Sequence, residues 1–135
     1  MKKGQIGTEY LILVGFIVFV LVTVLGLAVY YSSNVSDQIK FDQLQNFAIK
    51  IVSSAEQVFY AGEPSKVVIN AYLPEGVESL EILSNDIVFN VSTSSGVSVV
   101  AFKSDVPLSG SLTATAGVKR ISISATSSGV VISEG

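Results

Sequence analysis

The sequence predicts an α+β protein in which a long N-terminal α-helix, apolar in its first half and amphipathic in its second, precedes a small antiparallel β-domain. Three observations predict this fold. Residues 10–31 carry no charge, apolar residues then recur at three- and four-residue spacing as far as residue 59, and apolar and polar residues alternate from residue 66 onward. The predicted parts are a leader at residues 1–4, a helix at 5–61 and a β-domain at 62–135.

The first half of the helix is long enough to cross a membrane. Residues 10–31 form an uninterrupted apolar run with tyrosines at both ends, and about 20 apolar residues span the hydrocarbon of a bilayer. Lys2 and Lys3 precede this run, so the positive-inside rule places the N-terminus in the cytoplasm and the β-domain outside. A secretory signal peptide is the weaker interpretation, because its apolar region is usually about 7–15 residues long. A simple membrane anchor is an alternative.

The second half of the helix is amphipathic, with one apolar stripe between charged and amide side chains. Gly62, followed by Glu63 and Pro64, is a stop signal, so we expect one helix from about Ile6 to Ala61. A β-domain of this size is marginal alone, and we expect the stripe to cover one face of its sheet. The stripe comprises Ile39, Phe41, Leu44, Phe47, Ala48, Ile51, Val52, Ala55, Val58 and Phe59.

The alternating residues after Lys66 predict six to eight strands, arranged as a small sandwich. The clearest alternation covers 67–73, 80–82, 87–91 and 121–125. Abundant Ser and Thr after Ser92 suit exposed strand faces. Turn signals separate the strands at Pro74–Gly76, Ser84–Asn85, Ser94–Gly96, Leu108–Gly110, Ala116–Gly117 and Ser127–Gly129.

The composition excludes several kinds of chemistry. With no Cys and no His, the chain has no disulfide, no Cys/His zinc site and no imidazole base. The net charge of −3 and the lack of a basic cluster argue against nucleic-acid binding; we expect Lys119 and Arg120 to lie at a solvated strand edge. The acidic residues match no calcium loop. We therefore predict no catalytic residue, no metal, no cofactor and no enzymatic activity.

Two N-x-S sequons begin at Asn34 and Asn90 and are candidate N-glycosylation sites. The motif is short and frequent by chance. Because the predicted topology places both asparagines outside the cell, a glycoprotein is one expectation.

Glu9 stands directly before the apolar run. In one interpretation it is an acid that the helix dipole favours near the helix N-terminus. In the other, cleavage after Gly4 leaves Gln5 as the first residue, and Glu9 becomes the fifth residue of an apolar helix. A carboxylate in hydrocarbon is costly unless it is paired. The new α-amino group of a neighbouring chain would be the nearest cation, and this pairing would set the axial stagger between chains.

The segment KKGQIGTEYLILVG resembles the class III signal peptide of archaeal type IV pilin-like proteins. The similarity lies in the basic leader with Lys2 and Lys3, Gly4 before the cut, Gln5 as the first mature residue and the acid Glu9 at the fifth position. It covers about residues 1–31; the later segment YLPEGVESLEI matches more loosely. The resemblance implies cleavage by a prepilin peptidase, extraction from the membrane by the pilus assembly machinery, and packing into a helical filament.

We therefore expect a structural subunit that polymerises with copies of itself into an archaeal type IV-like pilus used for adhesion. Gln5, Glu9, Gly15 and Gly26 are the candidate assembly residues. The two glycines would let neighbouring helices approach closely, although they also suit an ordinary membrane helix. The subunit is expected in the cell membrane before assembly and in an extracellular filament afterwards. The alternatives are a monomeric membrane-anchored extracellular binding domain and, ranked lower because the chain is short, an archaellin.

Overall fold

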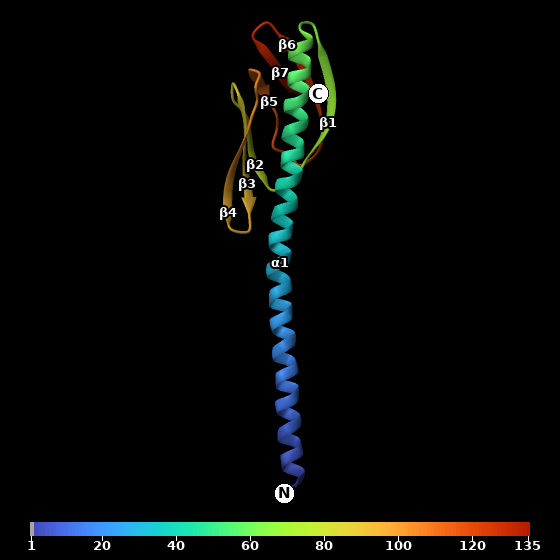
Figure 1. Ribbon diagram of the computed structural model, residues 1–135, viewed down its shortest axis with the longest axis vertical. Coiled ribbons are helices and arrows are strands. Elements are labelled where there is room, and N and C mark those ends of the chain that lie inside the picture. The colour runs from blue at the N-terminus through green and yellow to red at the C-terminus, as the bar shows by residue number, and fades with distance from the viewer. Residues whose placement is uncertain (1) are drawn as a thin grey trace. The chain divides into compact units, whose positions relative to one another are not determined.

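The computed structural model describes the backbone of residues 2–135 and the side chains of residues 4–135. It confirms the α+β fold, with one helix followed by seven strands, and the chain divides into two compact units, Met1–Ser36 and Asp37–Gly135. The elements, labelled in Figure 1, are α1 (Lys2–Ala61), β1 (Lys66–Leu73), β2 (Val77–Ile82), β3 (Asp86–Thr93), β4 (Gly96–Lys103), β5 (Leu108–Ser111), β6 (Gly117–Thr126) and β7 (Gly129–Glu134).

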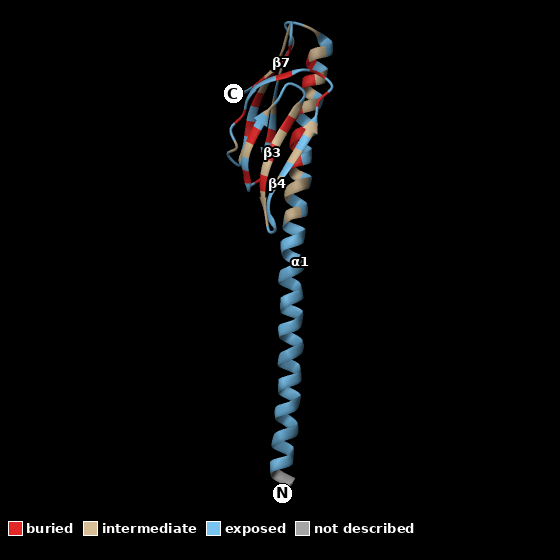
Figure 2. Ribbon diagram, turned by 90° about the vertical axis from the view of Figure 1, so that its left-hand side faces the viewer, coloured by how far each residue is buried: buried red, intermediate tan, exposed pale blue. Residues whose placement is uncertain are grey.

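The first unit contains only the N-terminal part of α1. Its helix begins at Lys2, four residues before the predicted start at Ile6. All its described side chains, from Gly4 to Ser36, are exposed. Figure 2 shows that burial within α1 is confined to the part of the helix that follows this unit.

The second unit is built around the amphipathic part of α1. Its buried residues recur every three or four positions along one side of the helix, as predicted, with Phe47 and Ala48 adjacent within this stripe. They join strand residues in one hydrophobic core. Ile39 was expected in this stripe but is 50% exposed. Since each residue turns the helix by about 100°, Ile39 points roughly 140° away from Leu44. The buried helix residues are Leu44, Phe47, Ala48, Ile51, Ala55 and Val58.

Helix α1 ends where the stop signal predicts. Gly62 has a positive φ of 81°, a conformation that glycine adopts without the steric cost of a Cβ atom. Its N–H donates to the Phe59 carbonyl at 3.1 Å, and the Ser65 N–H donates to the Gly62 carbonyl at 2.9 Å. The chain thereby reverses and enters β1.

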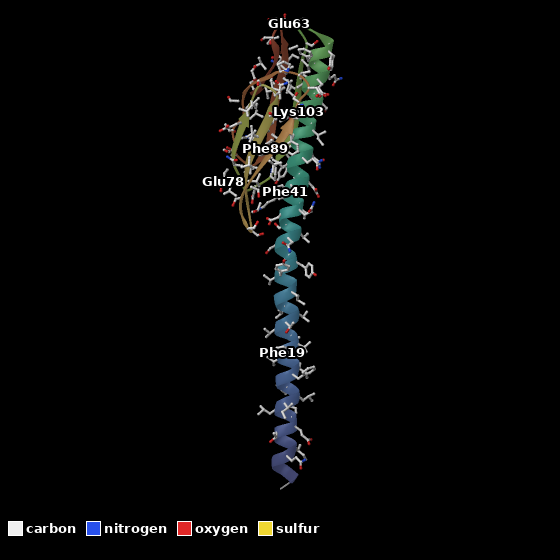
Figure 3. All side chains as sticks on the ribbon, turned by 60° about the vertical axis from the view of Figure 1, so that its left-hand side comes forward. Phe19, Phe41, Glu63, Glu78, Phe89 and Lys103 are labelled. Carbon is white, nitrogen blue, oxygen red and sulfur yellow. The ribbon has the colours of Figure 1, made fainter. Side chains whose placement is uncertain are left out.

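Two sheets pack against one side of the second part of α1 (Figures 1 and 2). Their strand orders are β1-β6-β7-β5 and β2-β3-β4. A backbone hydrogen bond joins the sheets where the Leu108 N–H of β5 donates to the carbonyl of Ser84, between β2 and β3, at 2.7 Å. Strands β1 and β4 are outer edges of the two sheets. The inner faces supply the rest of the core, in which Phe89 makes edge-to-face contacts with Phe47 and Phe102 at centroid distances of 6.1 and 5.8 Å (Figure 3).

Strand β5 corrects one prediction. Leu108–Gly110 was expected to be a turn, but it lies in β5, which pairs with β7 in parallel; the other strand pairs are antiparallel. Gly110 is needed there because a Cβ atom would lie 1.9 Å from the Ile132 carbonyl oxygen. At this position glycine allows two strands to approach closely. In the sequence the same glycine suggested a turn, because glycine is also common in turns.

Lys119 corrects a second prediction, because it is 5% exposed and does not lie at a solvated edge. Its strand, β6, lies between β1 and β7, and Lys119 shares the inward face with Ile121. The Lys119 ammonium donates to Glu134 Oε1 at 2.9 Å and to Thr113 Oγ1 at 2.7 Å. The Thr113 hydroxyl and N–H both donate to Glu134 Oε2, at 2.7 and 3.1 Å.

These contacts stabilise the charged form of Glu134. The Thr113 hydroxyl, the Lys119 ammonium and the Thr113 N–H together lower the pKa of the Glu134 carboxyl to about 2. A carboxyl whose pKa is lower in the folded than in the unfolded chain stabilises the fold above the unfolded pKa. That stabilisation is lost as the pH falls toward the folded value.

Replacing Ile51 tests whether α1 holds the second unit together. Because Ile51 is fully buried, Ile51→Ala is expected to lower the free energy of unfolding by about 2–5 kcal/mol. Ile49, two positions away and 52% exposed, is the matched control, and Ile49→Ala is expected to change it by less than about 0.5 kcal/mol. Denaturant unfolding of the full-length chain in detergent, followed by near-ultraviolet circular dichroism, measures both. Equal losses would contradict the packing described here.

The Glu134 network predicts a pH dependence. For the wild-type chain, the midpoint denaturant concentration is expected to fall as the pH is lowered from about 4.5 to about 2. Glu134→Gln should flatten this part of the profile, because the glutamine does not titrate. Glu78→Gln, an exposed residue on β2, should leave the slope unchanged. A wild-type slope in the Glu134→Gln variant would show that this carboxylate does not contribute to acid sensitivity.

Candidate assembly interface

The N-terminal part of α1 exposes a continuous apolar surface. Large hydrophobic side chains are exposed from Ile6 to Tyr31, on all sides of the helix. Within the described residues, α1 is the one helix long and apolar enough to cross a membrane. So extended an apolar surface is unfavourable in water, and surfaces of this kind mark contacts with membranes or proteins.

Three hydroxyl groups on or next to this surface bond to the backbone of the same helix. Thr8 donates to the Gly4 carbonyl at 3.0 Å, Thr23 to the Phe19 carbonyl at 2.8 Å, and Ser33 to the Val29 carbonyl at 3.3 Å. These bonds to the carbonyl four residues earlier remove the need for an outside hydrogen-bond partner. The surface between Tyr10 and Tyr31 is therefore suited to hydrocarbon or to other apolar helices.

Glu9 is the one charged residue at the border of this surface. It is exposed on α1 next to Tyr10, and no basic residue follows it before Lys40. The basic residues before it are Lys2 and Lys3, whose side chains, and hence the predicted leader charges, lie outside the described residues. Removal of residues 1–4 would leave Glu9 with no cationic side chain on its own apolar segment.

Gly15 and Gly26 are two positions on the apolar surface of α1 that carry no side chain. A Cβ atom added at either position would meet nothing within 4 Å. The two glycines are 11 residues apart, which is about three helical turns, so they lie within roughly 20° of each other around the axis. The structure thus places both predicted assembly glycines on the same side of α1.

The predicted cleavage site lies in the first turns of α1. Gly4 and Gln5 are both helical and exposed, and the Gly4 carbonyl, on the acyl side of the predicted cut, accepts the Thr8 hydroxyl. Glycine is a poor helix former, and backbone hydrogen bonding is incomplete at a helix start. Both features lower the cost of unwinding this peptide bond.

The two sequons differ in accessibility. Asn34 is exposed on α1. Asn90 is half-buried in β3, the central strand of its sheet, and its amide nitrogen donates to Ser79 Oγ at 2.7 Å. Asn34 is therefore the more accessible acceptor.

Sequence reasoning missed the polar contacts that hold α1 to the edges of the β-domain. The Asp37 carboxylate accepts the Ser94 hydroxyl at 2.5 Å and the Ser94 N–H at 3.1 Å, and these two bonds lower the pKa of Asp37. The Lys50 ammonium donates to the Asn70 carbonyl in β1. The two bonded residues are 57 positions apart in the first contact and 20 in the second. No local sequence pattern therefore predicts either contact.

The β-domain offers no comparable centre for chemistry. Among the described residues, no three carboxylates lie close enough together to hold a metal ion. The acidic residues of the turns and edges, Glu75, Glu78, Glu81 and Asp105, are exposed to solvent. Comparison with protein-family models, with curated proteins and with solved structures gives no match.

Proposed function

We propose that this chain is the structural subunit of a cell-surface filament, an archaeal type IV-like pilus, polymerised through the N-terminal part of α1. The observation that carries the proposal is the contrast within α1. The amphipathic part is buried by its own β-domain, whereas residues 4–36 are exposed on every side. A bundle of identical helices would bury that surface without needing a polar seam.

Glu9 supplies the specificity that an apolar bundle lacks. After cleavage between Gly4 and Gln5, the α-amino group of one chain and the Glu9 carboxylate of its neighbour would form an ion pair inside the bundle. Breaking a desolvated pair is costly, so neighbouring helices would be held at one axial stagger. Gly15 and Gly26 would allow close helix contact on one side. Because such a contact joins different surfaces of identical subunits and shifts each one along the axis, it would propagate into an open fibre.

The β-domain would form the outside of this filament and would carry its adhesive role. Residues 62–135 contain four basic and seven acidic side chains, a net charge of −3. Net negative charge and hydroxyl-rich strands favour solubility of the fibre. The positive-inside rule supports an extracellular location for this domain.

A monomeric extracellular binding domain tethered by α1 is the second candidate function. It is favoured by the fact that α1 alone is long and apolar enough to anchor the chain in a membrane. It requires neither cleavage nor a partner for Glu9. An archaellin would assemble through similar contacts and ranks third, because the chain is short and its first mature residues resemble those of pilins.

The N-terminus of the mature chain distinguishes these functions. In filaments sheared from intact cells, N-terminal sequencing or mass spectrometry is expected to find a chain that begins at Gln5. Gly4→Leu is expected to block cleavage, because a bulky residue replaces the small one before the cut. Gly15→Leu, the same substitution outside the cleavage site, should still be cleaved. An uncut wild-type chain recovered only with membranes would favour the tethered domain.

Replacing Glu9 tests the ion pair. Glu9→Gln is expected to insert into the membrane normally, since it removes a charge, but to reduce filament yield by about tenfold or more. Removal of one partner of a buried charge pair costs about 2–5 kcal/mol, and each 1.4 kcal/mol is about a factor of ten. Glu63→Gln, beyond the end of α1, is the matched control. Quantitative electron microscopy and immunoblotting of sheared and membrane fractions measure both. Normal filaments from Glu9→Gln would leave only the helix-dipole role.

A further inference from the structure

The outer face of the β1-β6 pair is apolar and basic. Tyr72 of β1 lies directly opposite Val118 of β6, and Asn70 lies opposite Arg120. Val118 is 73% exposed, and Tyr72 and Val68 are each nearly half exposed. Lys66 and Arg120 are the charged residues on these strands that point outward. We call Lys66, Val68, Tyr72, Val118 and Arg120 the basic face.

The outer face of the other sheet is apolar and acidic. Val97 and Val99 of β4 are 58% and 68% exposed. On β3, which pairs with β4, Val88 lies opposite Glu81 of β2, and Glu78 is exposed on β2, the other edge of this sheet (Figure 3). We call Glu78, Glu81, Val88, Val97 and Val99 the acidic face.

The two faces belong to the outer, convex sides of two different sheets, so neither covers the other within one chain. Single exposed apolar residues are ordinary on protein surfaces. Here each group lies on one face of one sheet. The charges beside the first group, Lys66 and Arg120, are basic. Beside the second group Glu78 and Glu81 are acidic, and the exposed Lys103 of β4 lies directly opposite Asp86, so this group keeps a net negative charge. The charges of the two groups are opposite, so the groups complement each other between copies of the chain.

We propose that the basic face of one β-domain docks on the acidic face of the β-domain in a neighbouring copy. The proposal rests on the proposed function, since it describes a contact in the assembled filament. A contact between two different faces does not form a closed two-fold dimer but repeats from copy to copy, and it generates a fibre when the repeat does not close into a ring. Tyr72 and Val118 would pack against Val97 and Val99, while Arg120 and Lys66 would meet Glu81 and Glu78.

A second copy is the occupant that the observations favour. Complementary charge steers the two faces together and disfavours basic-to-basic and acidic-to-acidic contacts. Packing of the α1 helices would hold neighbouring β-domains at high local concentration, so even a small contact would be occupied. Asn90 lies opposite Val99 in the acidic face, and a glycan there would block docking. The proposal therefore requires an unmodified Asn90, whose amide nitrogen is bonded to Ser79.

Charge reversal tests the contact in the full-length chain expressed in cells. Arg120→Glu and Glu81→Lys are each expected to reduce the yield of sheared filaments by about tenfold, because each places like charges together. The double variant Arg120→Glu/Glu81→Lys is expected to recover most of the wild-type yield. Glu63→Lys, a reversal outside both faces, is the matched control. Wild-type yields from both single variants would overturn the proposal while leaving the filament intact as a function.

Cysteine cross-linking tests the geometry, since the chain has no native Cys. The double variant Val118→Cys/Val99→Cys is expected to give a ladder of disulfide-linked multimers when filaments are oxidised, and each single variant is expected to stay monomeric. Tyr60→Cys/Val99→Cys pairs an exposed helix residue with the acidic face and should give no ladder. Dimers from either single variant would overturn the proposal, because they show a face meeting itself. If the wild-type chain forms no filaments, both this contact and the proposed function fail.

Discussion

Burial of the amphipathic part of α1 is the interaction on which the rest of the structure depends. The two sheets curve around one side of this helix, and their inner faces present Ile87, Phe89, Ile121 and Ile123 to it. Each fully buried side chain of this kind contributes about 1.5–3 kcal/mol. A β-domain of this size is marginal by itself, because it buries only a modest apolar surface. The helix therefore acts as the core of the domain as well as its connection to the N-terminal segment.

The two parts of α1 differ in what their side chains contact. The second part packs on the inner faces of the two sheets. At its borders it also makes two polar contacts with the β-domain, Asp37 with Ser94 and Lys50 with Asn70. Exposed polar contacts of this kind contribute little energy individually, but they define where α1 lies between β1 and the β3–β4 turn. The first part has no such surface, and its Thr8, Thr23 and Ser33 hydroxyls bond to carbonyls of the same helix. What remains available there is apolar area, together with one carboxylate at Glu9.

In the filament that we propose, the strongest association surface would lie on the helix and a weaker one on the β-domain. The apolar helix would supply most of the free energy of assembly in our proposal, and Glu9 would select the stagger. The basic and acidic faces would then select how neighbouring β-domains meet. The ion pair of Lys119 with Glu134 belongs to neither surface. Its Lys119 side chain faces the interior, whereas Glu134 is 34% exposed. The pair ties Thr113, which follows β5, to β6 and β7.

The amino-acid sequence by itself determined the features that depend on neighbours within a few residues. The uncharged run, the amphipathic stripe, the stop at Gly62 and most strands follow from periodicity, because one helix turn or one strand alternation is enough to show them. The positions of Glu9, Gly15 and Gly26 at the candidate interface follow in the same way. For Lys119 the prediction of a solvated edge was wrong, although the sequence contained the evidence. The alternation that places Ile121 and Ile123 inside also places Lys119 inside, and only its charge suggested an exposed position.

Tertiary structure alone decided the features that depend on residues distant in the chain. The parallel pairing of β5 with β7, the order of strands in two sheets, and the contact of Asp37 with Ser94 each join segments that no local pattern connects. Gly110 illustrates the reason. A glycine suits either a turn or a close approach, and only the position of Ile132 on the neighbouring strand selects the second. Strand register likewise places Tyr72 beside Val118, and Val99 on the same face as the acidic residues of β2. This register is set by the packing of both sheets on one helix.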